Sequence, residues 1–380
     1  MIAIDHEIRP LTGARAFAAA AIVATHIYPI LIYLTPLAKP AVPYLVCGAI
    51  AVDFFFILSG FIITHRYLES LGSPSWDRTK HFWVLRFARI WPVHAVVVIA
   101  FVVYHRVSLH FLGYGLSADN AGFVNTVANL LMLHQFPGST PINPPAWSLA
   151  PEFGAYLAFP VLVIGLARLR SPRVALAAAA VLLVAAALIV DNLVARDVSG
   201  SRVYQVAWSR IAFGFMAGCL LNVGWRCLPR GRRSPRWDVA IVAAVAGILV
   251  LAWWEARSGP IALPMEAYPL LGLLVLACGA STGPVAGFLG SPVVEWAGRV
   301  SYSVYVTHFL VIALAYSVLV REGLAAHGLP VRMLLGLLVV VAIVVAGAAC
   351  YYVVEEPARK GLRRLERRRQ SRVTERSRGD

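Results

Sequence analysis

Long apolar runs alternate with short polar intervals along almost the whole chain. A membrane-spanning helix needs about 20 predominantly apolar residues. Ten runs approach that length, and each is predicted to be a helix: 11–33, 45–66, 88–105, 147–168, 174–190, 205–224, 238–254, 266–288, 300–320 and 332–354. A weaker stretch at 122–135 is shorter and more polar, which favours an interfacial or re-entrant segment.

Composition supports a membrane protein. The 380 residues are 59% hydrophobic and 14% charged, whereas soluble domains carry about 25% charged residues. This excludes disordered chains and disulfide scaffolds. We therefore predict an all-α, polytopic transmembrane bundle, with one membrane domain at 1–356 and a basic cytoplasmic tail at 357–380.

The distribution of positive charge predicts the topology. Of the 34 lysines and arginines, 23 lie in four intervals and 7 lie in the alternating loops. Cytoplasmic loops concentrate positive charge, so ten spans would place both termini in the cytoplasm. The four intervals are 66–89, 168–173, 226–236 and 359–378. The charge accompanies no nucleic-acid-binding motif, so we expect its partner to be anionic membrane lipid and not nucleic acid.

Ionisable residues inside the predicted spans are candidates for function, because a charged group in the bilayer centre costs about 2.5–3.5 kcal/mol or more. Pairing between helices is the alternative explanation, and we favour it for Arg210. The candidates are Arg15, His26, Asp53, Glu152, Arg210 and His308.

Arg15 and His26 lie on one face of the first predicted helix. They are 11 residues apart, which corresponds to three turns plus about 20° and an axial separation of about 16 Å. Arg15 is expected near the cytoplasmic mouth and His26 deep in the membrane. A phosphate held at Arg15 could then deliver a thioester on a pantetheine arm to His26. The alternative is that the two residues are satisfied separately within the bundle.

Three ionisable residues are predicted at a similar depth. Measured from the outer end of its span, His26 lies about 10 Å deep, Asp53 about 9 Å and Glu152 about 8 Å. We expect the three to converge, with Ser148 one helical turn from Glu152. Such a cluster could bind a hydroxyl and move its proton, or bind the coupling ion of a transporter. No Cys/His spacing indicates a metal site, and no bound cofactor is predicted.

Six segments resemble, in order and over nearly the whole chain, the motifs of the membrane-bound acyltransferase 3 family of bacterial O-acyltransferases. They are LTGARAFAAAAIVATH at 11–26, AVDFFFILSGFII at 51–63, FWVLRFARIWPVH at 82–94, PAWSLAPEFGAYLAFP at 145–160, AGRVSYSVYVTHFLV at 297–311 and VVEEPARKGL at 353–362. In the last segment, Glu355 and Glu356 are both candidates for the carboxylate of the motif.

The resemblance implies an enzyme of the bacterial plasma membrane that transfers an acyl group from acyl-CoA, its co-substrate, to a hydroxyl of a sugar or glycosylated molecule. It marks Arg15 and His26 as the essential pair of the family. At the matching positions we expect His26, Asp53, Ser148 and Glu152 to act in catalysis, the cations Arg15, Arg86 and Arg89 to bind the acyl-CoA donor, and Trp147, Tyr302 and His308 to bind substrate.

Acyl transfer to a hydroxyl requires a general base, stabilisation of the oxyanion and exclusion of water. His26 is the expected base, because imidazole titrates near neutral pH. The competing hypothesis is a proton-coupled transporter in which His26, Asp53 and Glu152 form a relay. Such transporters contain inverted repeats, and the sequence shows no such symmetry.

Overall fold

The computed structural model describes residues 7–112, 121–195, 203–228, 233–258 and 264–362. Every regular element in these residues is helical, which confirms the all-α prediction. The α-helices are α1 (Arg9–Leu34), α2 (Val42–Cys47), α3 (Ala51–Leu71), α4 (Trp76–Leu112), α5 (Phe123–Leu130), α6 (Leu149–Arg168), α7 (Pro172–Ala195), α8 (Val203–Arg226), α9 (Trp237–Ser258), α10 (Tyr268–Ala280), α11 (Pro284–Leu289), α12 (Pro292–Arg321) and α13 (Leu329–Cys350).

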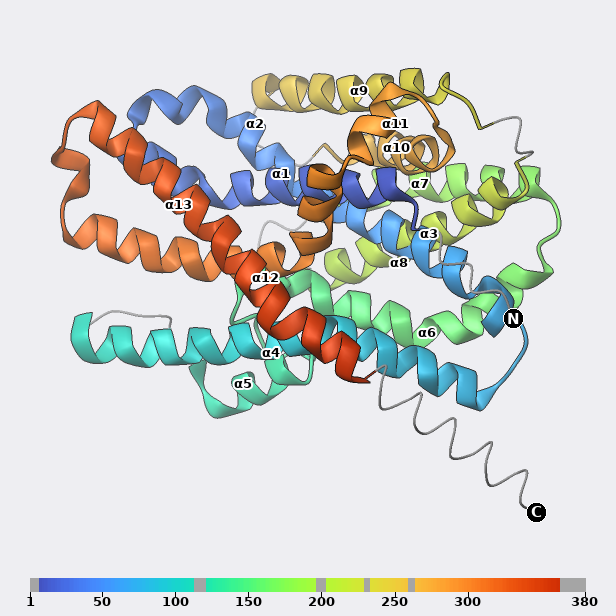
Figure 1. Ribbon diagram of the computed structural model, residues 1–380, viewed down its shortest axis with the longest axis horizontal. Helices are drawn as coiled ribbons and strands as arrows, with labels where there is room; N and C mark the ends of the chain where they lie inside the picture. The colour runs from blue at the N-terminus through green and yellow to red at the C-terminus, as the bar shows by residue number, and fades with distance from the viewer. Residues whose placement is uncertain (1–6, 113–120, 196–202, 229–232, 259–263, 363–380) are drawn as a thin grey trace, which may run out of the picture.

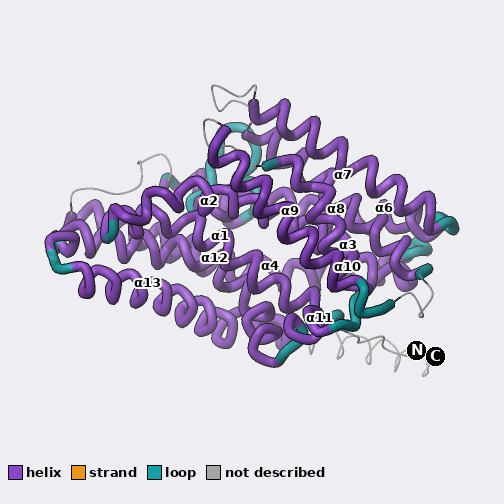
Figure 2. The backbone as a smooth tube through the Cα atoms, turned by 90° about the horizontal axis from the view of Figure 1, so that it is seen from above, coloured by secondary structure: helices purple, strands orange, loops and turns teal. Residues whose placement is uncertain are grey.

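Most of the long helices run side by side along the long axis of the molecule, and α13 crosses them obliquely (Figure 1). Within the described residues, nine helical segments are long and apolar enough to cross a membrane, and Met265–Ala280 is a shorter apolar one. This agrees with the prediction of about ten spans. Seen from above, α1 and α12 lie between α13 and the group formed by α3, α6, α7 and α8 (Figure 2).

The eighth predicted span, 266–288, is not one continuous helix. It consists of α10 and α11, which are separated at 281–283. Pro284 begins α11, and the residue before a proline is disfavoured in a helical conformation. The 13 residues of α10 extend over about 20 Å, less than the roughly 30 Å of a hydrocarbon core.

Glycines allow two pairs of helices to pack backbone against backbone. A Cβ atom on Gly60 of α3 would lie 2.0 Å from the carbonyl oxygen of Phe215 on α8, and one on Gly218 would lie 1.9 Å from that of Ile57. The contact of α1 with α12 is similar, because a Cβ on Gly298 would lie 1.8 Å from a carbonyl oxygen of α1. Lipid supplies no hydrophobic driving force for helix association. The close packing that small residues allow at such crossings therefore helps to hold the helices together.

The weaker apolar stretch at 122–135 contains a short helix that is held against α4. The indole of Trp91 donates to the carbonyl oxygen of Leu130 at 2.8 Å, and Nε2 of His94 lies 2.8 Å from that of Asn129. The loop that follows leads into the 3₁₀ turn Pro144–Ser148, at the start of α6. The segment therefore braces the entry to α6.

At its C-terminal end, α13 passes into a π-helical turn, Tyr351–Glu355, and the helix then continues to residue 362. Such turns interrupt the regular spacing of side chains and are frequent at functional sites. Glu355 is buried within the protein, whereas Glu356 pairs with Lys360 at 2.8 Å near the surface. The rest of the predicted basic tail, 363–380, lies outside the described residues.

Candidate active site

A cavity of about 400 Å³ lies between α1, α3, α4, α6 and α12. It opens where α1 begins and α3 ends, because the exposed residues Glu7 and Arg66 line its rim. Its polar lining includes Arg15, Ser59, Arg66, Arg86, Arg89, Ser148, Glu152, Tyr156, Ser301, Tyr302, Tyr305 and Arg359. Six of the ten residues predicted for the site therefore line one cavity: Arg15, Arg86, Arg89, Ser148, Glu152 and Tyr302.

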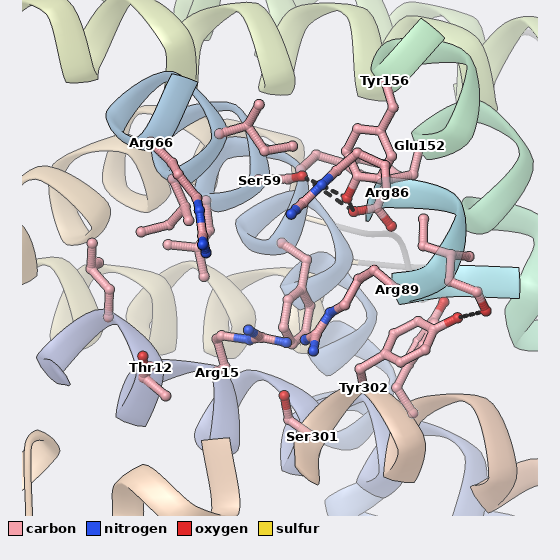
Figure 3. A pocket seen from close by; sticks show the side chains of 18 of the residues that line it. Thr12, Arg15, Ser59, Arg66, Arg86, Arg89, Glu152, Tyr156, Ser301 and Tyr302 are labelled. Carbon is pink, nitrogen blue, oxygen red and sulfur yellow. Dashed lines mark hydrogen bonds between the residues drawn. The ribbon is translucent and has the colours of Figure 1, made fainter. Parts of the chain in front are cut away.

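Three arginines converge on this cavity, Arg15 from α1 and Arg86 and Arg89 from α4 (Figure 3). The guanidinium of Arg15 makes no hydrogen bond or ion pair with any described residue, and its Nε is buried. Arg86 reaches the hydroxyl of Tyr67 at 3.4 Å and has no carboxylate partner in the described part of the chain. Desolvated cations without counter-charges are unfavourable, so the cavity is suited to an anionic ligand.

Arg89, in contrast, is held in place. It forms an ion pair with Glu355, whose other oxygen accepts a hydrogen bond from Ser303 at 2.7 Å. Its guanidinium also lies 5.6 Å from the ring centre of Tyr302. The hydroxyl of Tyr302 donates to the carbonyl oxygen of Ile90 at 2.7 Å. These contacts tie α4, α12 and the π-helical turn together along one wall.

Glu152 lies on another wall, in the first turn of α6. Its Oε1 accepts hydrogen bonds from the hydroxyls of Tyr156 and Ser59, the latter at 3.2 Å (Figure 3). Its Oε2 has no hydrogen-bond partner among the described residues. Ser59 lies in the second of the six motifs, at 51–63, whereas Tyr156 was not among the predicted site residues. The signal for Tyr156 was its position four residues after Glu152 on one helix face.

The 3₁₀ turn before α6 supports the deep end of the cavity. Ser148 Oγ lies 2.8 Å from the hydroxyl of Tyr305, which donates to the carbonyl oxygen of Pro145, so Ser148 donates to Tyr305. Trp147 does not line the cavity. Its indole ring lies against Arg210, whose guanidinium carbon is 4.7 Å from the ring centre.

Asp53 lies outside the cavity lining, in a fully buried ion pair. Arg210 binds both of its carboxylate oxygens, through Nε at 3.0 Å and Nη2 at 2.6 Å, and the hydroxyl of Tyr268 donates to the same carboxylate. The interhelical pairing expected for Arg210 is thereby confirmed. The charge of Asp53 is neutralised within the bundle.

His26 and His308 lie side by side beyond Tyr305. Nδ1 of His26 is 3.1 Å from Nε2 of His308 and 2.9 Å from the carbonyl oxygen of Ile22. Nδ1 of His308 is 2.6 Å from the carbonyl oxygen of Tyr305. The ring of Tyr305, which lines the cavity, has its centre 6.0 Å from that of His308.

The cluster of His26, Asp53 and Glu152 expected from span depth is not formed. Each residue has its own partners: His308 for His26, Arg210 for Asp53, and Tyr156 with Ser59 for Glu152. Among the described residues, no group of three or more His, Cys, Asp and Glu side chains could hold a metal ion.

The six motifs thus meet in one part of the bundle, with a positively charged cavity and a histidine pair. A model of the acyltransferase 3 family, described as an acyltransferase domain, matches residues 8–353. The chain belongs to this family. The membrane bundle described above is therefore an acyltransferase domain, and the resemblance inferred from the motifs is confirmed.

Similar proteins include the peptidoglycan O-acetyltransferase OatA of Listeria monocytogenes, 28% identical over 72% of this chain and 46% of its own length. The acyltransferase MdmB of Streptomyces mycarofaciens is 35% identical over 40% of this chain and 38% of its own. The putative peptidoglycan O-acetyltransferase YrhL of Bacillus subtilis is 27% identical over 70% of this chain and 45% of its own length. The chain spans less than half of the length of each of these relatives. No solved structure matches it significantly.

Proposed function

We propose that the chain is an integral-membrane O-acyltransferase that moves an acyl group from acyl-CoA to a hydroxyl of a carbohydrate. The observation that carries this proposal is the cavity in which Arg15 and Arg86 lack carboxylate partners among the described residues. Guanidinium groups bind phosphate oxygens in a bidentate manner. The phosphates of CoA would supply the negative charge that the cavity lacks.

The donor would enter at the open end, near Glu7 and Arg66. In the N-in orientation expected from the loop charges, that end faces the cytoplasm, where acyl-CoA is available. Phosphates bound by Arg15 and Arg86 leave the pantetheine arm to extend along the cavity towards Tyr305. The thioester would then lie at Tyr305, the residue that separates the cavity from His308 and His26. The acceptor hydroxyl would bind at this boundary, within reach of both the thioester and Nε2 of His26.

In the proposed reaction His26 takes the proton from the acceptor hydroxyl, whose oxygen attacks the thioester carbonyl carbon. The carbon–sulfur bond then breaks, and the CoA thiolate leaves and accepts the proton from His26. The free oxygen of Glu152 can accept a hydrogen bond from acyl-CoA. Ser148 orients Tyr305 through their hydrogen bond. Asp53 and Arg210 act through Trp147, by positioning the turn that carries Ser148.

The names of two relatives, which are peptidoglycan O-acetyltransferases, favour acetyl as the acyl group and a hydroxyl of peptidoglycan as the acceptor. The transporter hypothesis receives no comparable support, because a relay through His26, Asp53 and Glu152 would need contacts that these residues do not make, and Asp53 is engaged by Arg210.

Transfer of label from radiolabelled acetyl-CoA to an oligosaccharide of N-acetylglucosamine, by purified protein in lipid nanodiscs, tests the proposal. We expect transfer by the wild type and by His327→Ala, a change at an exposed residue. His26→Ala should lower turnover by about 100-fold or more while the protein elutes normally in size-exclusion chromatography. A wild type that transfers no label refutes the donor assignment, and an undiminished His26→Ala refutes the base.

A further inference from the structure

The contacts of the histidine pair determine where its hydrogen atoms lie. A carbonyl oxygen only accepts hydrogen bonds. Nδ1 of His308, 2.6 Å from the carbonyl oxygen of Tyr305, therefore carries a hydrogen. The same reasoning applies to Nδ1 of His26, which lies 2.9 Å from the carbonyl oxygen of Ile22.

Nε2 of His308 must then be the acceptor between the two rings. A neutral imidazole carries one N–H, and His308 already uses its N–H on Tyr305. A second hydrogen would point at the N–H of His26 across 3.1 Å. It would also create a cation at a residue that is fully buried and has no carboxylate among its contacts, which is unfavourable. His26 thus donates from Nδ1 to both His308 and Ile22.

We infer that His308 is a positioning residue that holds His26 in its Nδ1–H form, so that Nε2 of His26 carries the lone pair that takes the proton of the acceptor. This inference rests on the proposed function. Nε2 of His26 has no hydrogen-bond partner among the described residues. His308 has both ring nitrogens occupied within the protein, which replaces its expected role in substrate binding with a supporting one.

His308 also acts on the charged state of His26. Once Nε2 has taken a proton, the positive charge is shared with Nδ1, and the hydrogen bond to His308 becomes a charge-assisted one. The carboxylate that orients a catalytic histidine in hydrolases has the same two effects. The carbonyl oxygen of Ile22 also accepts the Nδ1 hydrogen of His26, but in the helix this oxygen is already placed to accept the backbone N–H of the same His26. Loss of His308 should therefore weaken the proton-accepting step.

Two substitutions separate this role from packing. His308→Gln keeps a side-chain oxygen that can accept from Nδ1 of His26, whereas His308→Leu fills similar space without an acceptor. We expect His308→Leu to lower kcat by about 10- to 100-fold with little change in KM for acetyl-CoA. His308→Gln should recover a large part of the loss. Equal kcat values for the two folded variants would overturn the inference.

¹⁵N NMR of the full protein, labelled with ¹⁵N-histidine, provides a readout that is independent of activity. Signals are assigned from spectra of His26→Ala and His308→Ala. We expect both rings to carry hydrogen at Nδ1 and to have a bare Nε2. A hydrogen on Nε2 of either ring would overturn the inference even in an active enzyme. An inactive wild type that shows the expected spectrum would instead count against the proposed function alone.

Discussion

Arg89 and Glu355 form an ion pair that joins α4 to the π-helical turn after α13, and the carboxylate of Glu355 is fully buried. Arg359, one turn further on, lies 3.6 Å from the same carboxylate. Two arginines and Ser303 therefore share Glu355, while its neighbour Glu356 faces Lys360. Of the two adjacent carboxylates that the sequence leaves as alternatives, Glu355 is the one that supports the cavity wall.

Glu355→Gln should lower both stability and activity. The amide can still accept a hydrogen bond from Arg89, but it does not compensate the charges of Arg89 and Arg359. We therefore expect the free energy of unfolding to fall by about 1–3 kcal/mol. Thermal unfolding followed by tryptophan fluorescence, together with KM for acetyl-CoA, measures the two effects. Glu356→Gln is the matched control and should change neither by much. Equal effects at the two positions would contradict the assignment of Glu355.

The buried pair of Asp53 and Arg210 gives a second prediction. Asp53→Asn leaves the guanidinium of Arg210 without a counter-charge in the bundle, and removal of one partner from a buried pair costs about 3–5 kcal/mol. Arg210→Gln in the same protein removes the uncompensated charge, so the double variant should unfold at a higher temperature than Asp53→Asn alone. If the double variant is less stable than either single variant, the direct contacts between Asp53 and Arg210 stabilise the bundle, and compensation of charge is not the main effect.

Much of the architecture could be predicted because lipid imposes a simple requirement on span length and composition. The exception at 266–288 arises from Pro284, which ends the helical run that hydropathy alone would continue. Both Arg15 and His26 lie on α1, as the first predicted span requires, but of the two only Arg15 lines the cavity, and His26 lies beyond Tyr305 against His308.

The arrangement of the site across helices could not be predicted in the same way. Depth along a span gives the height of a residue but not the face of the helix from which it points. His26, Asp53 and Glu152 were expected at one height, yet their side chains point to His308, Arg210 and Tyr156 respectively. The partner of a buried charge depends on how the helices are rotated against one another, and small residues such as Gly60 set that contact.

Gly60→Ala tests the crossing of α3 and α8. The new Cβ would lie 2.0 Å from the carbonyl oxygen of Phe215, which is backbone and cannot rotate away. Overpacking of this kind costs about 1–3 kcal/mol, so we expect a lower unfolding temperature and reduced activity. Gly165→Ala is the matched control, because nothing lies within 4 Å of a Cβ there. A destabilised Gly165→Ala would mean that helix propensity or lipid contact, and not the crossing, is being measured.

Reporter fusions test the predicted N-in and C-in topology. A fusion after Arg372 should report the cytoplasm, because 23 of the 34 lysines and arginines lie in the intervals assigned to that side. A fusion within 107–120 should report the exterior. Both reporters on one side would overturn the number of spans between them, and reversed signals would overturn the orientation of the cavity mouth.

Arg15→Ala should weaken the use of acetyl-CoA more than the use of the acceptor. Arg15 lines the cavity and makes no hydrogen bond or ion pair with any described residue, so its removal leaves no protein partner unsatisfied. A charged hydrogen bond to phosphate contributes about 1.5–3 kcal/mol, which corresponds to a rise of about 10- to 100-fold in KM for acetyl-CoA. High donor concentration should then rescue part of the rate. Arg15→Lys retains the charge without the bidentate geometry and should be intermediate, while Arg106→Ala, at an exposed position of α4, is the control. If KM for acetyl-CoA stays constant and only kcat collapses, Arg15 acts at the reacting centre and does not anchor the phosphate.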